Sequence, residues 1–136
     1  MKKKILIVVA DYYKNISSGL ISSAKKEIQN SLSISIKHVP GVFEIPVTIS
    51  KNINKFNGFI ALGCIIKGET DHDVYISHAV ANGLIKVSIK NNKPVIFGVL
   101  TTNNLNQALE RCGGKHGDKG LESAQSLLQL ISNFKD

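Results

Sequence analysis

The segment from Gly63 to Asp73, GCIIKGETDHD, holds a histidine shortly after a glycine-containing turn. A histidine side chain titrates near neutral pH, so His72 can accept or donate a proton if a substrate lies within its reach. We therefore take His72 as the candidate catalytic residue. We expect His72 to lie at the start of a helix, on its inward stripe. A histidine there is also commonly a packing residue, and the sequence alone leaves both roles open.

The residues directly before His72 predict an anion site. Gly68 is expected to let the backbone turn sharply, so that the amides of Glu69 and Thr70 point outward at the start of a helix. Exposed amides, the helix dipole and a threonine hydroxyl together suit one phosphate group. An ordinary helix cap would look the same. The segment is not a P-loop, because Glu69 stands where that motif needs a lysine.

A second candidate is the glycine-rich segment 111–120, RCGGKHGDKG, which also carries several basic side chains. Of the 17 Lys and Arg residues in the chain, only Arg111 is an arginine. A lone arginine among lysines suggests a position that needs the planar, two-pronged guanidinium. Together with the anion site, Arg111, His116 and Lys119 would form a phosphate clamp, although a solvated loop could have the same composition.

Two aromatic side chains form a third candidate binding site. Tyr12 and Tyr13 follow the first apolar run and could stack on a planar heterocycle, although either could equally belong to the core. Cys64 and Cys112 are too few for a disulfide framework, and neither has a second Cys or a His at metal-ligand spacing. We therefore expect no metal and no disulfide.

Composition narrows the class of protein. The 136 residues predict one domain, 1–136. The net charge of +7 invites a nucleic-acid partner, but the lysines are spread along the chain and do not alternate with aromatics. No apolar run reaches the ~18 residues of a membrane span. We expect a cytoplasmic protein with neither a nucleic-acid nor a membrane partner. The excess of basic over acidic residues equally suits small anionic substrates.

Four apolar runs rich in β-branched residues predict strands. The first, third and fourth are continuously apolar, which is typical of parallel strands buried on both faces, whereas the second suits an edge. The predicted strands are Lys4–Ala10, Ile34–Val39, Phe59–Ile66 and Pro94–Leu100. The predicted helices are Ile16–Asn30, Glu44–Ile53, one starting near His72, Leu105–Leu109 and Leu121–Ile131. The apolar stripe of the third helix consists of Tyr75, Ile76, Ala79, Val80, Gly83, Leu84 and Val87.

Strands that alternate with helices indicate right-handed βαβ units. The fold class is therefore α/β, a flavodoxin-like three-layer sandwich around a four-stranded parallel sheet. Ligands of such sheets bind beyond the carboxyl ends of the strands. This rule favours the segments Asp11–Asn15, Pro40–Glu44, Lys67–Asp73 and Thr101–Asn104.

Taken together, these segments resemble the lumazine synthase family over essentially the whole chain. The matching blocks, in the family's order and spacing, are PGVFEIP at Pro40–Pro46, GCIIKGETDHDVYI at Gly63–Ile76, FGVLT at Phe97–Thr101 and ERCGGKHGDKG at Glu110–Gly120. The resemblance implies condensation of 5-amino-6-ribitylaminouracil with 3,4-dihydroxy-2-butanone 4-phosphate. The products are 6,7-dimethyl-8-ribityllumazine, phosphate and water, in the penultimate step of riboflavin biosynthesis, and no cofactor takes part.

The resemblance also assigns roles, motif by motif. The proton-shuttling histidine of the family corresponds to His72. Arg111 and the Glu69–Thr70 segment would bind the phosphate of the butanone substrate. Tyr13 would stack on the pyrimidine ring, and the backbone of Cys64, Ile65 and Ile66 would pair with the edge of that ring. Val42, Phe43 and Glu44 would line the ribityl chain. Phe97 would come from a neighbouring subunit, and His116 and Lys119 would add positive potential around the substrates.

Some features depart from the family pattern. Tyr13-Lys14 replaces the common Phe-Asn, and Val42 replaces a small hydroxyl residue. Only about four residues precede the first strand, whereas capsid-forming members typically have more. We therefore expect a homopentamer, or a decamer of two stacked pentamers, and not a sixty-subunit capsid.

Two alternatives stay open on the same scaffold. One is an archaeal-type riboflavin synthase, which would not need Arg111 or Glu69–Thr70. The other is a flavin- or lumazine-binding module, which would retain Tyr13 without needing His72 or Arg111. A receiver domain is excluded, because no aspartate follows the third strand at Ile65-Ile66.

Overall fold

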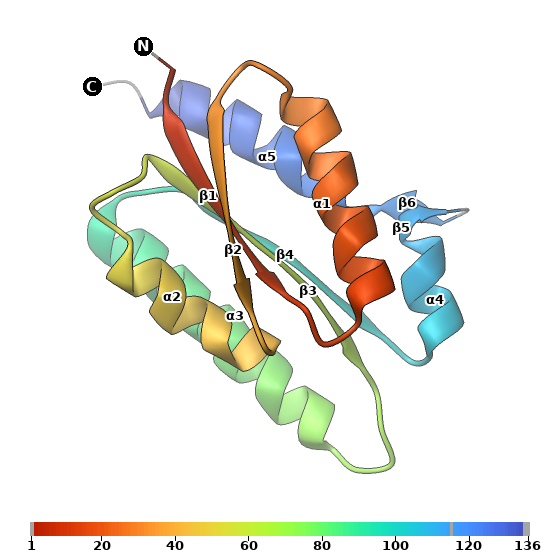
Figure 1. Ribbon diagram of the computed structural model, residues 1–136. Helices are drawn as coiled ribbons and strands as arrows, with labels where there is room; N and C mark the ends of the chain where they lie inside the picture. The colour runs from red at the N-terminus through yellow and green to blue at the C-terminus, as the bar shows by residue number, and fades with distance from the viewer. Residues whose placement is uncertain (1, 115, 135–136) are drawn as a thin grey trace.

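The computed structural model describes residues 2–114 and 116–134 and contains a four-stranded parallel sheet of order β2-β1-β3-β4. The strands are β1 (Lys4–Ala10), β2 (Ser33–Val39), β3 (Gly58–Ile66) and β4 (Val95–Thr102). Helices α1 (Lys14–Ile28) and α5 (Lys119–Asn133) cover one face, and α2 (Ile45–Lys51) and α3 (His72–Asn91) cover the other (Figure 1). The predicted α/β three-layer sandwich is thus confirmed.

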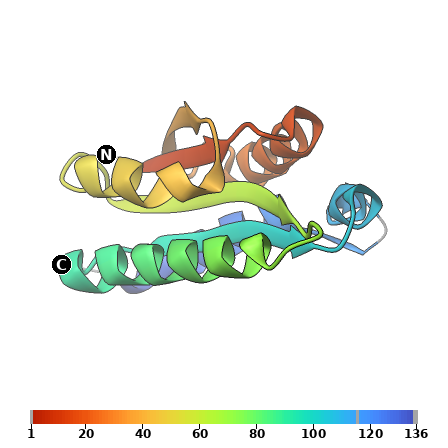
Figure 2. The same ribbon diagram turned by 90° about the horizontal axis from the view of Figure 1, so that it is seen from below.

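The central strands show why their sequences are continuously apolar. In β1, Ile5, Ile7 and Val9 pack toward α1 and α5, while Leu6 and Val8 pack toward α2 and α3. All five side chains are 0% exposed. Because helices cover both faces of the sheet, both rows of alternating side chains are buried. A polar side chain in either row would lose the favourable free energy of burying apolar surface. Figure 2 shows the long helix α3 lying along one side of the sheet.

The prediction that the fourth strand is buried on both faces holds only in part: Val99 (4% exposed) and Leu100 (6% exposed) lie in the cores on opposite faces of the sheet. β4 is an edge strand, as β2 is at the opposite end of the sheet. Phe97 is 39% exposed and Thr101 is also exposed, so the strand is not covered along its whole length. The half-exposed pattern of β2 did predict its edge position correctly.

The predicted stripe of α3 is too wide. Tyr75 is 71% exposed and Ala79 is exposed, whereas Asp73, Val80 and Leu84 face the sheet. The helix buries a single row, spaced by three or four residues, so the neighbouring apolar row stays at the surface. Further along this surface lie Ile85 and Ile89.

A hairpin stands where the sequence predicted only a glycine-rich break between helices. After α4 (Leu105–Glu110), strands β5 (Cys112–Gly114) and β6 (Gly117–Asp118) pair antiparallel. α5 begins at Lys119, two residues before the predicted Leu121, because the Asp118 carboxylate accepts a hydrogen bond from the Leu121 N–H at 3.2 Å. In the described part of the chain, every helix is too short or too polar to cross a membrane.

Candidate functional site

The sheet opens at the carboxyl ends of β1 and β3. Pairing of β1 with β3 ends at Val9 and Leu62, while β3 continues to pair with β4 as far as Ile66 and Thr102. β1 instead stays with β2, where the Asp11 N–H donates to the Val39 carbonyl at 2.9 Å. One edge of residues 63–66 of β3 is therefore uncovered, and its backbone groups are free to pair with a ligand.

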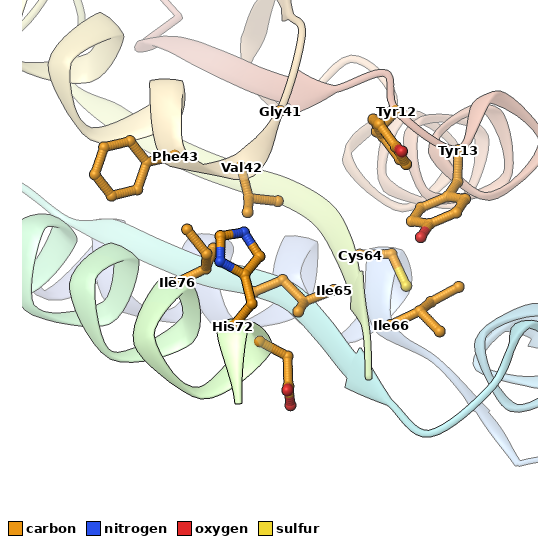
Figure 3. Close-up of a pocket in the computed structure, with 11 residues that line it drawn as sticks. Tyr12, Tyr13, Gly41, Val42, Phe43, Cys64, Ile65, Ile66, His72 and Ile76 are labelled. Carbon is orange, nitrogen blue, oxygen red and sulfur yellow. The ribbon is translucent and has the colours of Figure 1, made fainter. Parts of the chain in front are cut away.

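A cavity of about 350 Å³ lies at this opening. We call it the β1–β3 pocket, and Figure 3 shows the side chains that surround it. Its lining consists of Tyr12, Tyr13, Gly41, Val42, Phe43, Cys64, Ile65, Ile66, His72, Asp73 and Ile76. Three of the four segments that the strand-end rule favoured thus meet in one place, namely those after β1, after β2 and after β3.

Tyr13 forms an aromatic wall at one end of the pocket. Its ring is half-buried against the core and meets Tyr12 edge to face, with ring centroids 4.9 Å apart. Burial, and then the neighbouring Tyr12, raise the pKa of the Tyr13 phenol, so that the ring is neutral at physiological pH. A neutral half-buried ring suits stacking on a planar heterocycle.

The loop after β2 forms the opposite wall. A Cβ on Gly63 would lie 2.7 Å from Val42 Cγ1, so glycine lets Val42 pack directly on β3. Phe43 follows in the 3-10 turn η1 (Val42–Glu44) and is 58% exposed beside the pocket. Glu44 does not line the cavity, but a Cβ on Gly41 would lie 3.1 Å from Glu44 Oε1. The carboxylate is therefore next to a lining residue.

His72 is the first residue of α3 and its ring lies among Val42, Ile65 and Ile76 (Figure 3). The prediction that His72 lies on the inward stripe is wrong, because its side chain is exposed and the inward residue at this turn is Asp73. Exposure toward a cavity leaves the imidazole accessible to a substrate and to protons.

The predicted anion site at Glu69 and Thr70 lines neither this pocket nor the one described below. The Thr70 hydroxyl accepts a hydrogen bond from the His72 backbone N–H at 3.3 Å, and both Glu69 and Thr70 are exposed. The expected role of Gly68 is wrong. It has no positive φ and has room for a side chain, so the turn does not require glycine.

Cys64 lies on the pocket wall but is a poor nucleophile there. It is 8% exposed, and burial raises the pKa of its thiol to about 11, although a hydrogen bond with Thr102 offsets part of the effect. Burial also raises the pKa of Cys112. Within residues 2–114 and 116–134, no group of three or more His, Cys, Asp and Glu side chains is arranged to hold a metal ion.

A second cavity, of about 310 Å³, lies beside the edge strand. We call it the β4 pocket. It is lined by Val99, Leu100, Thr101, Arg111, His116, Lys119 and Glu122. The three predicted basic residues thus come together, while Lys115 of the same segment lies outside the described residues.

Backbone and side-chain contacts hold the basic residues of the β4 pocket in place. The Lys119 N–H donates to the Arg111 carbonyl at 2.8 Å. The His116 backbone N–H donates to the Glu110 carbonyl at 3.1 Å, and its Nε2 lies 3.2 Å from Glu110 Oε2. The pocket lining contains three cationic or titratable side chains and one acid, Glu122, while Glu110 contacts His116 from outside the lining. This excess of basic groups suits an anion.

The two pockets have no lining residue in common. Phe97 lines neither, but it lies on β4 two and four residues before Val99 and Thr101. Alternate residues of a strand share a face, so Phe97 lies on the same face of β4 as Val99 and Thr101 of the β4 pocket.

Sequence reasoning missed Gly41, Asp73 and Ile76 as lining residues. Asp73 and Ile76 were detectable, because they precede Val80 by seven and four residues and so share the buried row of α3. Gly41 carries no such signal, since it lines the pocket through its backbone only.

An open parallel α/β sheet, with an aromatic-walled pocket at its strand ends and a separate pocket rich in basic side chains, defines a flavodoxin-like protein. The family model of 6,7-dimethyl-8-ribityllumazine synthase matches residues 2–135. The chain belongs to this family, as its sequence motifs predicted.

Individual relatives agree with this assignment. The chain is 44% identical to the 6,7-dimethyl-8-ribityllumazine synthase of Buchnera aphidicola, over 96% of this chain and 87% of that protein. It is 41% identical to the enzyme of the same name from Leuconostoc mesenteroides, over 98% of this chain and 89% of that protein. The enzyme of that name from Limosilactobacillus reuteri is also 41% identical, over 95% of this chain and 88% of that protein.

Proposed function

We propose that this chain condenses 5-amino-6-ribitylaminouracil with 3,4-dihydroxy-2-butanone 4-phosphate to give 6,7-dimethyl-8-ribityllumazine, phosphate and water. It is a transferase of riboflavin biosynthesis. The observation that carries the proposal is the β1–β3 pocket, which joins an aromatic wall, an uncovered strand edge and a histidine in one cavity. Family membership supports the same reaction.

The pyrimidine substrate occupies the β1–β3 pocket in this proposal. Its ring stacks on Tyr13, and its polar edge pairs with the uncovered backbone of Cys64, Ile65 and Ile66. The ribityl chain runs along Val42 and Phe43, where the Glu44 carboxylate can accept hydrogen bonds from its hydroxyls. These contacts bring the reacting amine to the end of the cavity at His72.

The chemistry is imine formation between the uracil amine and the butanone carbonyl, elimination of phosphate, and ring closure. His72 exchanges the protons that these steps require, since its imidazole is accessible in the cavity. The Arg111 guanidinium binds the phosphate with two parallel hydrogen bonds, and His116 and Lys119 add positive potential. The exposed Glu69–Thr70 segment is a further phosphate contact in this scheme.

The active form is a homopentamer, or two stacked pentamers, in which neighbouring copies share each site. The family resemblance implies that Phe97 comes from a neighbour, and Phe97 shares one face of β4 with Val99 and Thr101 of the β4 pocket. The copy that supplies Phe97 therefore also supplies Arg111, His116 and Lys119. The apolar side chains of Tyr75, Ile85 and Ile89 offer surface for such contacts.

We place the reaction in the cytoplasm, which suits two free cysteines. Incubating the protein with both substrates tests the function, with lumazine fluorescence and phosphate release as readouts. We expect both signals to rise together, and neither to rise when one substrate is omitted. Riboflavin formed from lumazine alone would indicate the riboflavin synthase alternative, and flavin binding without turnover would indicate the binding module. Light scattering tests the assembly.

A further inference from the structure

The side chains of Asp11 and His38 form a hydrogen-bonded pair at the carboxyl ends of β1 and β2, and neither residue lines a pocket described above. His38 Nδ1 lies 2.8 Å from Asp11 Oδ2 and 3.0 Å from Asp11 Oδ1. An ionised carboxylate only accepts hydrogen bonds, so Nδ1 carries the hydrogen and donates it, whether the imidazole is neutral or protonated. The scheme above gives this pair no role.

The pair joins two strands just before they separate. β1 and β2 pair in register as far as Ala10 and Val39, and the Asp11 N–H adds a last backbone hydrogen bond to the Val39 carbonyl. Beyond this point the chain after β1 leads into α1, and the chain after β2 leads into η1. Among the described residues, no hydrogen bond joins residues 12–15 to residues 40–44.

The two separating segments carry opposite walls of the β1–β3 pocket. Tyr12 and Tyr13 directly follow the acid of the pair, and η1 begins four residues after the histidine. Figure 3 shows the two tyrosines on one side of the cavity and the first residues of η1, Val42 and Phe43, on the other. The pair is therefore placed where it can fix the distance between the walls.

The links from the pair to both walls are short and restrained. The Tyr13 carbonyl accepts hydrogen bonds from two N–H groups in the first turn of α1, at 3.1 and 3.0 Å. On the other side, Pro40 has a restricted φ, and the Gly41 carbonyl accepts a hydrogen bond from the last residue of η1 at 3.2 Å. A shift between the paired side chains would therefore reach the walls, because no loose loop lies between to absorb it.

We propose that Asp11 and His38 are positioning residues, which set the distance between the two walls of the β1–β3 pocket and so favour binding of ribitylaminouracil between them. The inference rests on the proposed function. Ala10, Val39 and Val42 belong to one core cluster, so apolar packing supports the same strand ends without the pair. The Asp11 side chain is 31% exposed and that of His38 is 56% exposed, so the effect of the pair on binding is modest.

The test is a double-mutant cycle in the full-length assembled protein, with Asp11→Ala, His38→Ala and the double variant. KM for each substrate and kcat are measured, and calorimetry gives Kd for ribitylaminouracil alone. Melting temperature and light scattering report the fold and the assembly. His38→Asn is a rescue variant, because the asparagine amide can place an N–H close to the position of Nδ1. Lys37→Ala is the matched control, since Lys37 is the exposed neighbour of His38 on the same strand and lines neither pocket.

We expect each single alanine variant to raise KM and Kd for ribitylaminouracil about 2- to 5-fold, the range of partly exposed charged pairs. The double variant should bind no more weakly than the weaker single variant, because the second substitution removes nothing further. His38→Asn and Lys37→Ala should bind like the wild type. KM for butanone phosphate and kcat should stay close to their wild-type values, since the phosphate binds in the other pocket.

Unchanged Kd for ribitylaminouracil in both single variants would overturn the inference. So would losses that multiply in the double variant, or no recovery in His38→Asn, because the hydrogen bond between the two residues would then not be the cause. An equal loss for both substrates with a lower melting temperature would also overturn it, since the pair would then act on stability.

Wild-type protein in the same assays separates these failures from a failure of the proposed function. If the wild type makes no lumazine, the proposed function is wrong. If the wild type is active and the alanine variants equal it, only the positioning role of Asp11 and His38 is wrong.

Discussion

The β1–β3 pocket and the β4 pocket differ in how they are built. The first is made by three strand ends and has walls that are largely apolar, with His72 and Asp73 at one helix start. The second is made by an edge strand and the segment around a hairpin, and gathers Arg111, His116 and Lys119. In the proposed scheme the planar ring binds in the first pocket and the phosphate in the second, and the two pockets share no lining residue. Substitutions in each pocket should therefore affect one substrate at a time.

The largest effect should come from His72→Ala, which removes the proton-exchanging group and keeps both binding surfaces. We expect kcat to fall ~10²- to 10⁴-fold with the assembly intact. His78→Ala is the matched control, since His78 lies exposed on the same helix and lines neither pocket. Steady-state kinetics measure both variants. A His72→Ala variant that does not fold would favour a packing role instead.

Arg111→Lys should raise KM for butanone phosphate about 10-fold and Arg111→Ala about 100-fold, with little change for ribitylaminouracil. Lysine keeps the charge but has no planar fork, so it cannot replace both hydrogen bonds. Lys86→Ala removes an exposed cation outside both pockets and should have no effect. Wild-type kinetics in Arg111→Ala would show that the phosphate binds elsewhere.

Tyr13→Ala should weaken ribitylaminouracil binding about 10- to 100-fold, because stacking on a base-like ring contributes roughly 1–3 kcal/mol. Binding of butanone phosphate should change much less. Tyr13→Phe keeps the ring and should bind almost normally. Titration of each substrate by calorimetry distinguishes the cases, and equal losses for both substrates would assign Tyr13 to the core.

The smallest effect should be on thermal stability in inorganic phosphate. At about ten times its dissociation constant, a ligand stabilises the native state by about 1.4 kcal/mol, which raises the melting temperature by a few degrees. We expect this rise in the wild type and in Tyr13→Ala, and a smaller one in Arg111→Ala. Differential scanning fluorimetry measures it. An equal rise in Arg111→Ala would place bound phosphate outside the β4 pocket.

The sequence predicted the strands well because burial on both faces leaves a distinctive mark. The run Lys4–Ala10 was predicted with the bounds of β1, and the half-exposed second run gave the edge strand β2. The sequence did not reveal that β4 is an edge strand, because residues 95–100 are as apolar as those of a central strand. An apolar run fits a central strand and an edge strand equally well, and the order of strands in a sheet depends on long-range packing.

The residues of the site were predictable to different degrees. Residues at strand ends, such as Tyr13 and Val42, follow from the rule for parallel sheets, and the structure brings them into one pocket. The orientation of α3 did not follow, because Asp73 and His72 differ by about 100° around the helix axis and either could face inward. The separation of Arg111 from His72 into two pockets depends on long-range packing, which no local pattern contains.

The most direct test of a site shared between copies is a complementation experiment with two impaired variants, assayed at a butanone phosphate concentration far below the raised KM of Arg111→Ala. His72→Ala and Arg111→Ala subunits are mixed under denaturing conditions and refolded together, and lumazine formation is measured. In a closed ring with one site per subunit contact, random mixing gives about a quarter of the sites both intact residues. We therefore predict recovery of about a quarter of wild-type activity, against almost none for either variant refolded alone. A mixture as inactive as its components would contradict the shared site and would place His72 and Arg111 of one chain in the same active site.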